Sequence, residues 1–346
     1  MSAPAHGGNG DPSRRSPLAV PAIERIWIRA AASLGFTIER GTSAYASSDG
    51  RGTITIGVPE ILDDDDAVAQ LVFHELCHAV VEGPEAAALP DWGLDNTGTA
   101  AGGVTREHAC LRIAVHLAAA CGLRDVMAPT TEHRGYHDAL PARALFDDAD
   151  PAAAIAREAL ERAGRRAGEG QPRWTVVLAD ALRETAVALG RLHPVGLRWG
   201  SPGETCGTCA WRFIGGRGAP VERCRQAGGQ RTMAAQPACE LWEGPIECGP
   251  CGACCREAYH VVAVSPRDPV VRRAPALMVR RGRRLEILRD RDRCAALAGA
   301  GGNADPYRCR IYDDRPRTCR DFQRGGDHCL EARRRVGLGP VVAARY

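Results

Sequence analysis

Cysteine is distributed very unevenly along this chain, and the distribution restricts what its C-terminal part can fold into. Of fifteen cysteines, three precede residue 206 and twelve lie between residues 206 and 329. The chain shows no apolar leader and no apolar run long enough to span a membrane, so we expect a cytoplasmic protein without a membrane partner. A disulfide framework is disfavoured in that reducing compartment. We therefore expect the dense cysteines to bind metal, because an unmetallated cluster would make a poor core.

The densest group, which we call the C-terminal cysteine cluster, begins at residue 248 with the sequence CGPCGACC. The neighbours Cys254 and Cys255 point in different directions, so either they serve two ions or one of them lies outside the ligand shell. Arg315 and Arg320 are expected to donate hydrogen bonds to thiolates and to offset their negative charge. The eight candidate ligands are Cys248, Cys251, Cys254, Cys255, Cys294, Cys309, Cys319 and Cys329.

This part of the sequence resembles the YkgJ-family cysteine cluster domain over residues 246–335. The resemblance rests on the CGACC pattern, on the stretch YRCRIYDDRPRTCRDF, and on Cys329 beyond it. It implies a zinc- or iron-chelating domain. The loop between Cys294 and Cys309 is longer than is usual in that family.

A second group of cysteines precedes this cluster, with the spacing C-x2-C-x14-C-x14-C. A CxxC knuckle brings two sulfurs onto one ion, and two further cysteines complete a tetrahedral set of four thiolates. Four thiolates also suit an iron–sulfur cluster. We therefore predict a metal knuckle, with zinc or iron, whose ligands are Cys206, Cys209, Cys224 and Cys239.

A different kind of metal motif lies near residue 75, where the sequence reads HELCH. Residues four apart share one face of a helix, so His74 and His78 can reach a single ion. Glu75 lies beside them as a candidate general base that would activate a water molecule. The other three cysteines, Cys77, Cys110 and Cys121, are in apolar helical stretches and are expected to be buried as small hydrophobic residues.

The HExxH motif needs a third ligand from elsewhere in the chain. Glu107, at the start of the next predicted helix, is the first candidate, and the adjacent His108 is the alternative. Asp91 and Asp95 are further candidates, as ligands or as groups that support ligands. Two histidines and a carboxylate suit zinc in a hydrolytic site and ferrous iron in an oxygenase site, so residue type alone leaves the metal open.

The region around the motif resembles two families, in each case over residues 70–120. HELCH with a glutamate on a following helix resembles minimal zinc metallopeptidase domains. FHELCHAVVEG, followed by DWG and then by REH, also resembles the elongation factor P hydroxylase family, which implies an iron site. The expected cofactor is thus zinc or iron, with an iron–sulfur cluster in the cysteine-rich part as a further alternative.

The patterns predict an α+β chain. Its N-terminal domain is mainly helical with a small sheet, and its C-terminal modules are small, irregular, cysteine-rich and metal-bound. Helices are expected at 22–34, 67–81, 106–120, 151–167 and 174–192, and a strand at 53–58. The expected organisation is a disordered tail (1–21), an HExxH domain (22–140), a helical connector (141–200), a four-cysteine knuckle (201–245) and a YkgJ-like domain (246–346).

Composition and the remaining patterns limit the function. The net charge is only +3, and arginine stands at every position where a lysine or an arginine could supply positive charge, because the chain has no lysine. Abundant arginine is therefore weak evidence for nucleic-acid binding, and a nucleic-acid partner is not expected. No phosphate-binding loop or nucleotide fingerprint appears, whereas a protein substrate or partner fits. Three functions stay open: a zinc-dependent hydrolase or peptidase, an iron-dependent hydroxylase that receives electrons from iron–sulfur clusters, and non-enzymatic metal storage, delivery or sensing.

Overall fold

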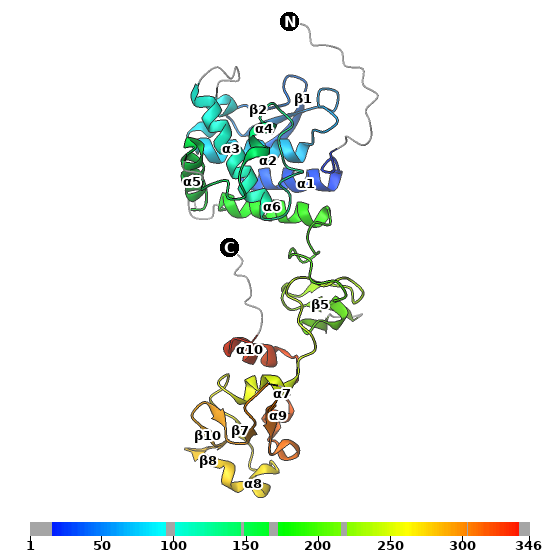
Figure 1. Ribbon diagram of the computed structural model, residues 1–346, viewed down its shortest axis with the longest axis vertical. Helices are drawn as coiled ribbons and strands as arrows, with labels where there is room; N and C mark the ends of the chain where they lie inside the picture. Colours follow the sequence, from blue (N-terminus) through cyan, green and yellow to red (C-terminus); the bar gives the residue numbers. More distant parts are fainter. Residues whose placement is uncertain are drawn as a thin grey trace. The chain divides into compact units, whose positions relative to one another are not determined.

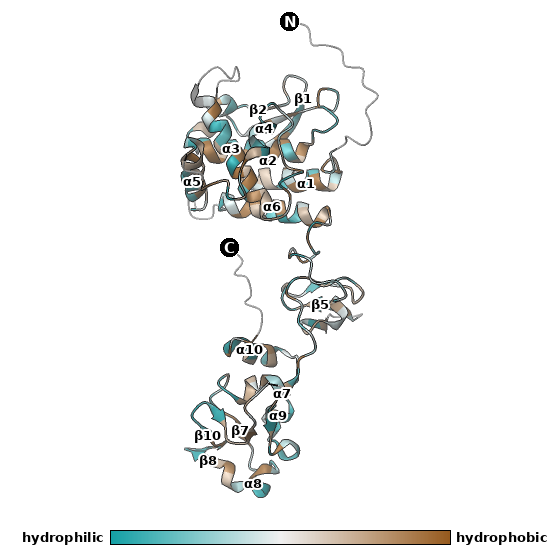
Figure 2. Cartoon of the chain, viewed as in Figure 1, coloured by the Kyte–Doolittle hydropathy of each residue, from teal (hydrophilic) through white to brown (hydrophobic). Residues whose placement is uncertain are grey.

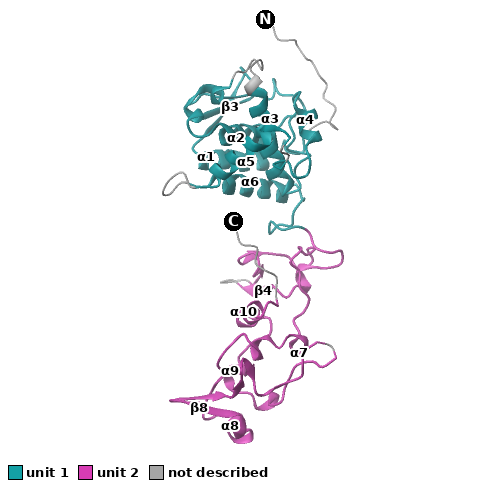
Figure 3. Ribbon diagram, turned by 60° about the vertical axis from the view of Figure 1, so that its left-hand side comes forward, with its two compact units in different colours: residues 1–198 teal, residues 199–346 magenta. Residues whose placement is uncertain are grey.

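The chain divides into two compact units, Met1–Arg198 (unit 1) and Trp199–Tyr346 (unit 2), coloured separately in Figure 3. The computed structural model describes residues 16–94, 101–146, 149–165, 172–215, 220–302 and 304–338. Most of the predicted tail, residues 1–15, lies outside the described residues, and the first helix begins at Pro21.

Unit 1 is mainly helical, with one small sheet (Figure 1). Its helices are α1 (Pro21–Ser33), α2 (Val68–Glu82), α3 (Ala101–Ala119), α4 (Arg134–Ala139), α5 (Pro151–Ala163) and α6 (Trp174–Ala188). Its strands are β1 (Thr37–Gly41), β2 (Ala46–Ser48) and β3 (Thr53–Gly57). The sheet has the order β1-β3-β2, with β1 parallel and β2 antiparallel to the central β3.

Helix α2 carries the HExxH motif through the middle of unit 1. Most of its residues are buried, which explains why its apolar side chains run around the helix and do not form a single stripe. The helix ends at Gly83, whose φ of 84° is one that an L-residue rarely adopts. Arg162 of α5 donates to the carbonyl oxygens of Val80 and Val81, which lack partners inside the helix. The C-terminal end of the helix that carries the motif is thus held by α5.

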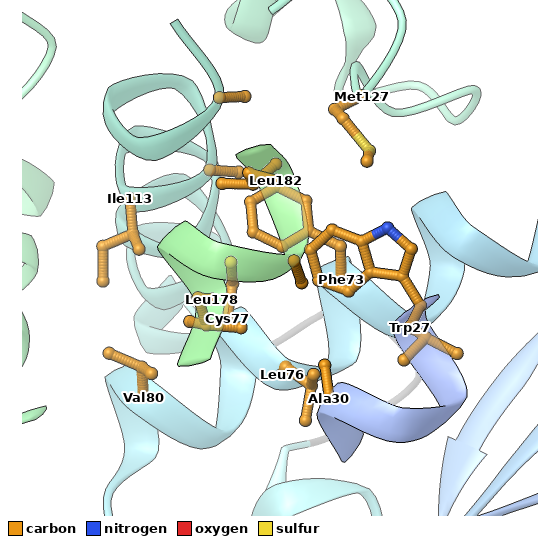
Figure 4. Close-up of a cluster of buried hydrophobic side chains, with 14 of the residues drawn as sticks. Trp27, Ala30, Phe73, Leu76, Cys77, Val80, Ile113, Met127, Leu178 and Leu182 are labelled. Atoms are coloured by element: carbon orange, nitrogen blue, oxygen red, sulfur yellow. The ribbon is translucent and has the colours of Figure 1, made fainter. Parts of the chain in front are cut away.

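The core of unit 1 joins helices that are far apart in sequence. Figure 4 shows Trp27 of α1, Phe73 of α2 and Leu182 of α6 gathered in one buried cluster. The rings of Trp27 and Phe73 lie 5.0 Å apart, and the Trp27 indole donates to the Thr185 hydroxyl at 3.1 Å. The hydropathy colouring in Figure 2 shows hydrophobic residues along α2 and α6, which both contribute to this core.

The predicted α+β class is confirmed: the described residues combine helices with sheets of two or three strands. The predicted helix 106–120 is longer at its start, since α3 begins at residue 101. Helices α5 and α6, predicted as a connector in residues 141–200, pack against α3 and α1 and share their core. No helix in the described parts of the chain has both the length and the apolar character needed to cross a membrane.

Unit 2 is built from short elements separated by turns. Its helical turns are η4 (Cys206–Thr208), α7 (Cys248–Cys251), η5 (Ala253–Cys255), α8 (Val270–Arg273), η6 (Pro275–Leu277), η7 (Tyr312–Asp314), α9 (Arg317–Arg320) and α10 (Asp327–Arg335). Its strands are β4 (Arg212–Gly215), β5 (Val221–Cys224), β6 (Gln230–Arg231), β7 (Ala263–Val264), β8 (Met278–Arg281), β9 (Arg284–Ile287), β10 (Arg289–Asp290), β11 (Arg293–Cys294), β12 (Leu297–Ala298) and β13 (Arg308–Cys309). Its buried residues form several small clusters, and cysteines are members of each.

Candidate metal centres

The first candidate centre, the histidine–carboxylate site, lies between α2 and α3. His74 and His78 are one turn apart on α2, and their Nε2 atoms are 3.1 Å apart. Glu107 of α3 faces both rings: its Oε1 is 3.4 Å from His74 Nε2 and its Oε2 is 3.0 Å from His78 Nε2. Bonds of about 2.0–2.1 Å from a tetrahedral ion place its ligand atoms about 3.3 Å apart. The three groups are therefore spaced as the ligands of one ion would be.

The electrostatics of the site favour the deprotonated form, in which a side chain can bind metal, for Glu107 and His74. Burial alone would raise the pKa of Glu107, but its hydrogen bond to His78 and its attraction to His74 hold the pKa at about 2. Burial lowers the pKa of His74 despite the nearby carboxylate, which keeps this imidazole neutral. Burial lowers the pKa of His78, but the Glu107 hydrogen bond and the negative charges of Glu107, Glu75 and Glu82 together outweigh burial, so the pKa is raised. The His74 side chain is 27% exposed, so a bound ion would be open to small molecules on that side.

Glu75, the candidate base, is held by a tryptophan. Its Oε2 accepts a hydrogen bond of 2.8 Å from the Trp92 indole, and both side chains are buried. Trp92 and the preceding Asp91 have φ values of 60° and 47° in the turn η3 (Pro90–Gly93). Such values are unfavourable for residues with a side chain. The turn is therefore a strained one that brings an indole N–H to the Glu75 carboxylate.

The other candidates for the third ligand have different positions. The ring of His108 stacks on that of Tyr136, with centroids 3.5 Å apart and planes 8° from parallel. Asp91 accepts a hydrogen bond from the backbone N–H of Ser48 at the end of β2. Asp95 lies outside the described residues. Of the described candidates, Glu107 is the one that contacts both histidine rings.

A cysteine that we expected to be only a packing residue also contacts this site. Cys110 of α3 is buried, as expected, and its Sγ is 3.8 Å from the Nδ1 atom of His74. Ligand atoms of His74, His78 and Cys110 all lie within 4.8 Å of one another. Burial and the neighbouring Cys77 thiol raise the pKa of Cys110, so this thiol stays protonated. It donates to the carbonyl oxygen of His74, and this bond helps to fix the backbone of His74.

The predicted knuckle is the second candidate centre. Cys206 begins η4, Cys209 follows that turn, Cys224 ends β5, and Cys239 bridges to Trp199. Burial raises the pKa of Cys206 to about 11, and the thiolates of Cys239, Cys209 and Cys224 add to the rise. Cys209 and Cys224 pack against the buried Trp211 in one small cluster. Bound metal would replace the protons that this arrangement favours.

The third candidate centre is a cavity of about 860 Å³ in unit 2, which we call the thiol cavity. All eight cysteines of the C-terminal cysteine cluster line it. Apolar side chains, including Val262, Ile287 and Phe322, form other parts of its wall. Except for Cys248, which is exposed, these cysteines are buried or half-buried thiols. A cavity that gathers so many soft ligands in an apolar setting suits thiophilic metal ions.

Arginines offset part of the negative charge that thiolates would bring to this cavity. Arg315 and Arg324 line it, and both lower the pKa of Cys248 against the larger effect of burial. Arg315 donates to the Tyr312 carbonyl oxygen with its guanidinium stacked on that ring. Arg320 instead donates to the Arg315 carbonyl and pairs with Asp268, so it orders the α9 turn. Arg320, which was expected to support thiolates, is therefore not among the residues that line the cavity, whereas Arg324, which was not expected there, is.

Comparison with known proteins supports the third centre. Residues 247–335 match the family model described as "CxxCxxCC: Putative zinc- or iron-chelating domain". The C-terminal cysteine cluster thus lies in a zinc- or iron-binding domain, as its sequence predicted. No curated protein and no solved structure matches the chain. The resemblance of residues 70–120 to metallopeptidases and to elongation factor P hydroxylases has no counterpart in these matches.

Two residues that contact the histidine–carboxylate site were not identified from the sequence. Trp92 contacts Glu75 across seventeen positions, and Cys110 contacts His74 across thirty-six. The DWG sequence offered a weak signal for Trp92, because a tryptophan between an aspartate and a glycine suits a tight turn. Cys110 lies three positions after Glu107, on the same helical face, and that spacing is a signal that could have found it.

Proposed function

We propose that the protein is a metal-dependent hydrolase whose catalytic site is the histidine–carboxylate site and whose C-terminal domain holds zinc or iron through thiolates. The observation that carries the proposal is the spacing of His74, His78 and Glu107, whose facing atoms are 3.0–3.4 Å apart. Side chains held at that spacing by two buried helices are preorganised for one divalent ion.

The residues around the site supply what hydrolysis needs beyond the ligands. A bound ion would polarise a carbonyl group and a water molecule. Glu75, next to His74 on the same helix, would take the proton of that water. The Trp92 indole fixes one oxygen of the Glu75 carboxylate and leaves the other to receive the proton. Because the pKa of Glu107 is held at about 2, its carboxylate stays ionised as a ligand and does not compete as an acid.

Metal content tests the ligand set first. In the full chain, Glu107→Gln and His78→Ala are expected to lower zinc content by one ion per chain after equilibration with zinc. The matched control is His108→Ala, which changes the next residue of α3 and is expected to leave zinc content unchanged. A loss of zinc in the control, with none in Glu107→Gln, would reject the assignment.

Catalysis is tested with the zinc-loaded full chain and a mixture of peptides from a digested proteome, with new termini detected by mass spectrometry. We expect cleavage by the unmodified chain and at least a hundred-fold slower cleavage by Glu75→Gln, with zinc still bound. Equal cleavage by both would remove Glu75 from the mechanism. A fully zinc-loaded chain that cleaves no peptide argues against a peptidase. Site iron in anaerobically purified protein, together with dioxygen consumption, would favour an oxygenase.

A further inference from the structure

The two histidines of the histidine–carboxylate site differ in what their second ring nitrogen contacts. In both residues the Nε2 atom faces Glu107, so Nε2 is the nitrogen that would bind an ion. The Nδ1 atom of His74 lies 3.8 Å from the Sγ atom of Cys110. The Nδ1 atom of His78 is buried and has no hydrogen-bond partner among the described residues. His78 therefore lacks the support that Cys110 gives to the ring of His74.

This difference matters because binding of an ion fixes the tautomer of a histidine. A neutral imidazole that binds an ion through Nε2 carries its proton on Nδ1. A buried N–H group needs an acceptor, and metal-binding histidines almost always donate this proton to a carboxylate, a backbone carbonyl or water. The acceptor for His78 should therefore be a buried oxygen atom near its Nδ1 atom, with no other partner.

Glu82, at the end of α2, has such an oxygen. Its side chain is 5% exposed, and its Oε2 atom is 3.1 Å from the Nη1 atom of Arg106 on α3. Its Oε1 atom is buried without a hydrogen-bond partner among the described residues. In the described part of unit 1, the Nδ1 atom of His78 and the Oε1 atom of Glu82 are the only two buried side-chain nitrogen or oxygen atoms in that condition. One of them is a donor when Nε2 binds an ion, and the other is an acceptor.

The geometry of α2 brings these two groups together. Residues 78 and 82 are one turn apart on the same face of the helix. Side chains of a helix point back towards its N-terminus, so the long side chain of Glu82 extends over the turn that contains His78. Both side chains also contact consecutive residues of α3, since Glu82 pairs with Arg106 and His78 contacts Glu107. The carboxylate and the ring therefore share one contact surface between α2 and α3.

A short adjustment would join the two atoms, which no hydrogen bond links in the structure. The terminal torsion of a glutamate is broad, so the carboxylate can turn while the rest of the side chain stays in place. One water molecule can also bridge two buried polar groups. Glu82 lines a cleft of about 480 Å³ with Thr105 and Glu158, and this cleft gives water access to the region.

We propose that Glu82 is a positioning residue for His78, whose Nδ1–H group donates to the Oε1 atom of Glu82, directly or through one water molecule, when Nε2 binds an ion. The bond would fix the tautomer and the orientation of the ring. The inference rests on metal binding by the histidine–carboxylate site in the proposed function, and it does not depend on which reaction that site performs.

Zinc affinity of the full chain is the first test. Site zinc is the zinc that the unmodified chain binds and that His74→Ala/His78→Ala does not, so zinc in unit 2 is excluded from the comparison. The free zinc concentration at half-occupancy, set with zinc buffers, is expected to rise about ten- to a hundredfold in Glu82→Ala. Glu82→Gln keeps an acceptor oxygen and is expected to bind zinc more tightly than Glu82→Ala does. The control is Glu158→Ala, the same change in an exposed glutamate of the same cleft, which should leave the affinity unchanged.

A spectroscopic measurement separates this role from a purely structural one. The chain has ten histidines, so isotopic labelling of histidine nitrogen gives few imidazole signals in the zinc-loaded chain. The Nδ1–H signal of His78, identified by its absence in His78→Ala, is expected to be protected from exchange with solvent. Glu82→Ala should lose that protection. Arg106→Gln, which removes the ion pair and keeps Glu82, should retain it.

A variant that misfolds would not decide the question. Glu82→Met fills the space of the side chain without an acceptor, and it replaces Glu82→Ala if the latter loses its helical circular dichroism signal. The unmodified chain gives a test without any substitution, because an Nδ1–H group of His78 that exchanges freely in the zinc-loaded chain would overturn the inference.

The zinc measurements can also overturn it. If Glu82→Ala and Glu82→Met leave the affinity for site zinc unchanged, Glu82 does not support His78. If Arg106→Gln lowers the affinity as much as Glu82→Ala does, and the Nδ1–H signal stays protected in both, Glu82 acts only through its ion pair. An unmodified chain without site zinc would refute the proposed function and this inference together. A loss of zinc affinity and of Nδ1–H protection in Glu82→Ala, with no peptide cleavage by the unmodified chain, would support the inference while refuting the hydrolase.

Discussion

The histidine–carboxylate site and the thiol cavity rest on different amounts of apolar core. Helices α2 and α3, which carry the first site, have fifteen and nineteen residues and belong to one large buried cluster. The thiol cavity lies among helical elements of three to nine residues and strands of two to four, with small clusters that contain the cysteines themselves. The comparison indicates that unit 1 positions His74, His78 and Glu107 by packing. Unit 2 has little apolar core of its own, so we expect its packing to depend on bound metal.

Removal of metal should separate the two units most clearly. Structural zinc in small domains contributes about 10 kcal/mol or more to folding, so chelation should unfold much of residues 247–335 and leave α1 to α6 folded. Hydrogen exchange with mass spectrometry, with and without chelator, measures this. Unchanged protection in residues 247–335 after complete removal of metal would break the comparison, because unit 2 would then fold by packing alone.

A cavity in the apolar core should affect only unit 1. Phe73 is 1% exposed and contacts Trp27, so Phe73→Ala is expected to destabilise unit 1 by about 3–5 kcal/mol. Denaturant unfolding followed by the helical circular dichroism signal, to which the long helices of unit 1 contribute most, measures the loss. Ile28→Ala, on the exposed side of α1, is the control and should change stability by about 0.5 kcal/mol or less. If Phe73→Ala also lowered the metal content of residues 247–335, the two units would not fold independently.

A buried ion pair gives a smaller effect in the same unit. Arg112 is 1% exposed and donates to Asp150, which also caps α5 through the Ala152 N–H. Asp150→Ala would leave a buried guanidinium without this carboxylate, at a cost of about 3 kcal/mol. The control is Asp180→Ala, which removes an exposed pair with Arg183 and should cost less than about 1 kcal/mol. Similar midpoints of urea unfolding for both variants would mean that the buried Arg112–Asp150 pair contributes no more to stability than the exposed Asp180–Arg183 pair.

The smallest expected effect concerns Glu75. Trp92→Phe removes the indole donor but keeps most of the ring, so it should cost about 1.5 kcal/mol of stability, the scale of a hydrogen bond to a charged group. Zinc content should stay unchanged, since Trp92 contacts none of the three ligands by hydrogen bond. If the hydrolase proposal holds, Trp92→Phe should slow peptide cleavage in the otherwise unmodified chain. In a chain that already carries Glu75→Gln, adding Trp92→Phe should slow cleavage no further. Loss of zinc from Trp92→Phe would show that the indole supports the ligands themselves.

Much of the architecture could be predicted because it depends on local pattern. The helix of the HExxH motif, the strand at β3 and the helices of residues 151–188 appear where periodicity, Gly83 and Pro151 indicated, with ends that differ by a few residues. The packing of α5 and α6 against α1 and α3 could not be predicted, since connector helices and core helices have the same amphipathic pattern. Two small residues, Ala152 and Ala181, are buried at those contacts and carry little signal of their own.

The sequence by itself determined which chemistry is available: a histidine pair one helical turn apart, a glutamate beside it, and cysteines in numbers that imply metal. Only the tertiary structure decided how these groups combine. Adjacent residues of a helix point about 100° apart. The orientation of α3 about its axis therefore places Glu107 against His78 and His108 against the ring of Tyr136. In the same way, Cys254 and Cys255 are neighbours in sequence, and separate packing clusters assign them to different parts of the thiol cavity. Those choices depend on which distant elements pack together, and no local pattern records that.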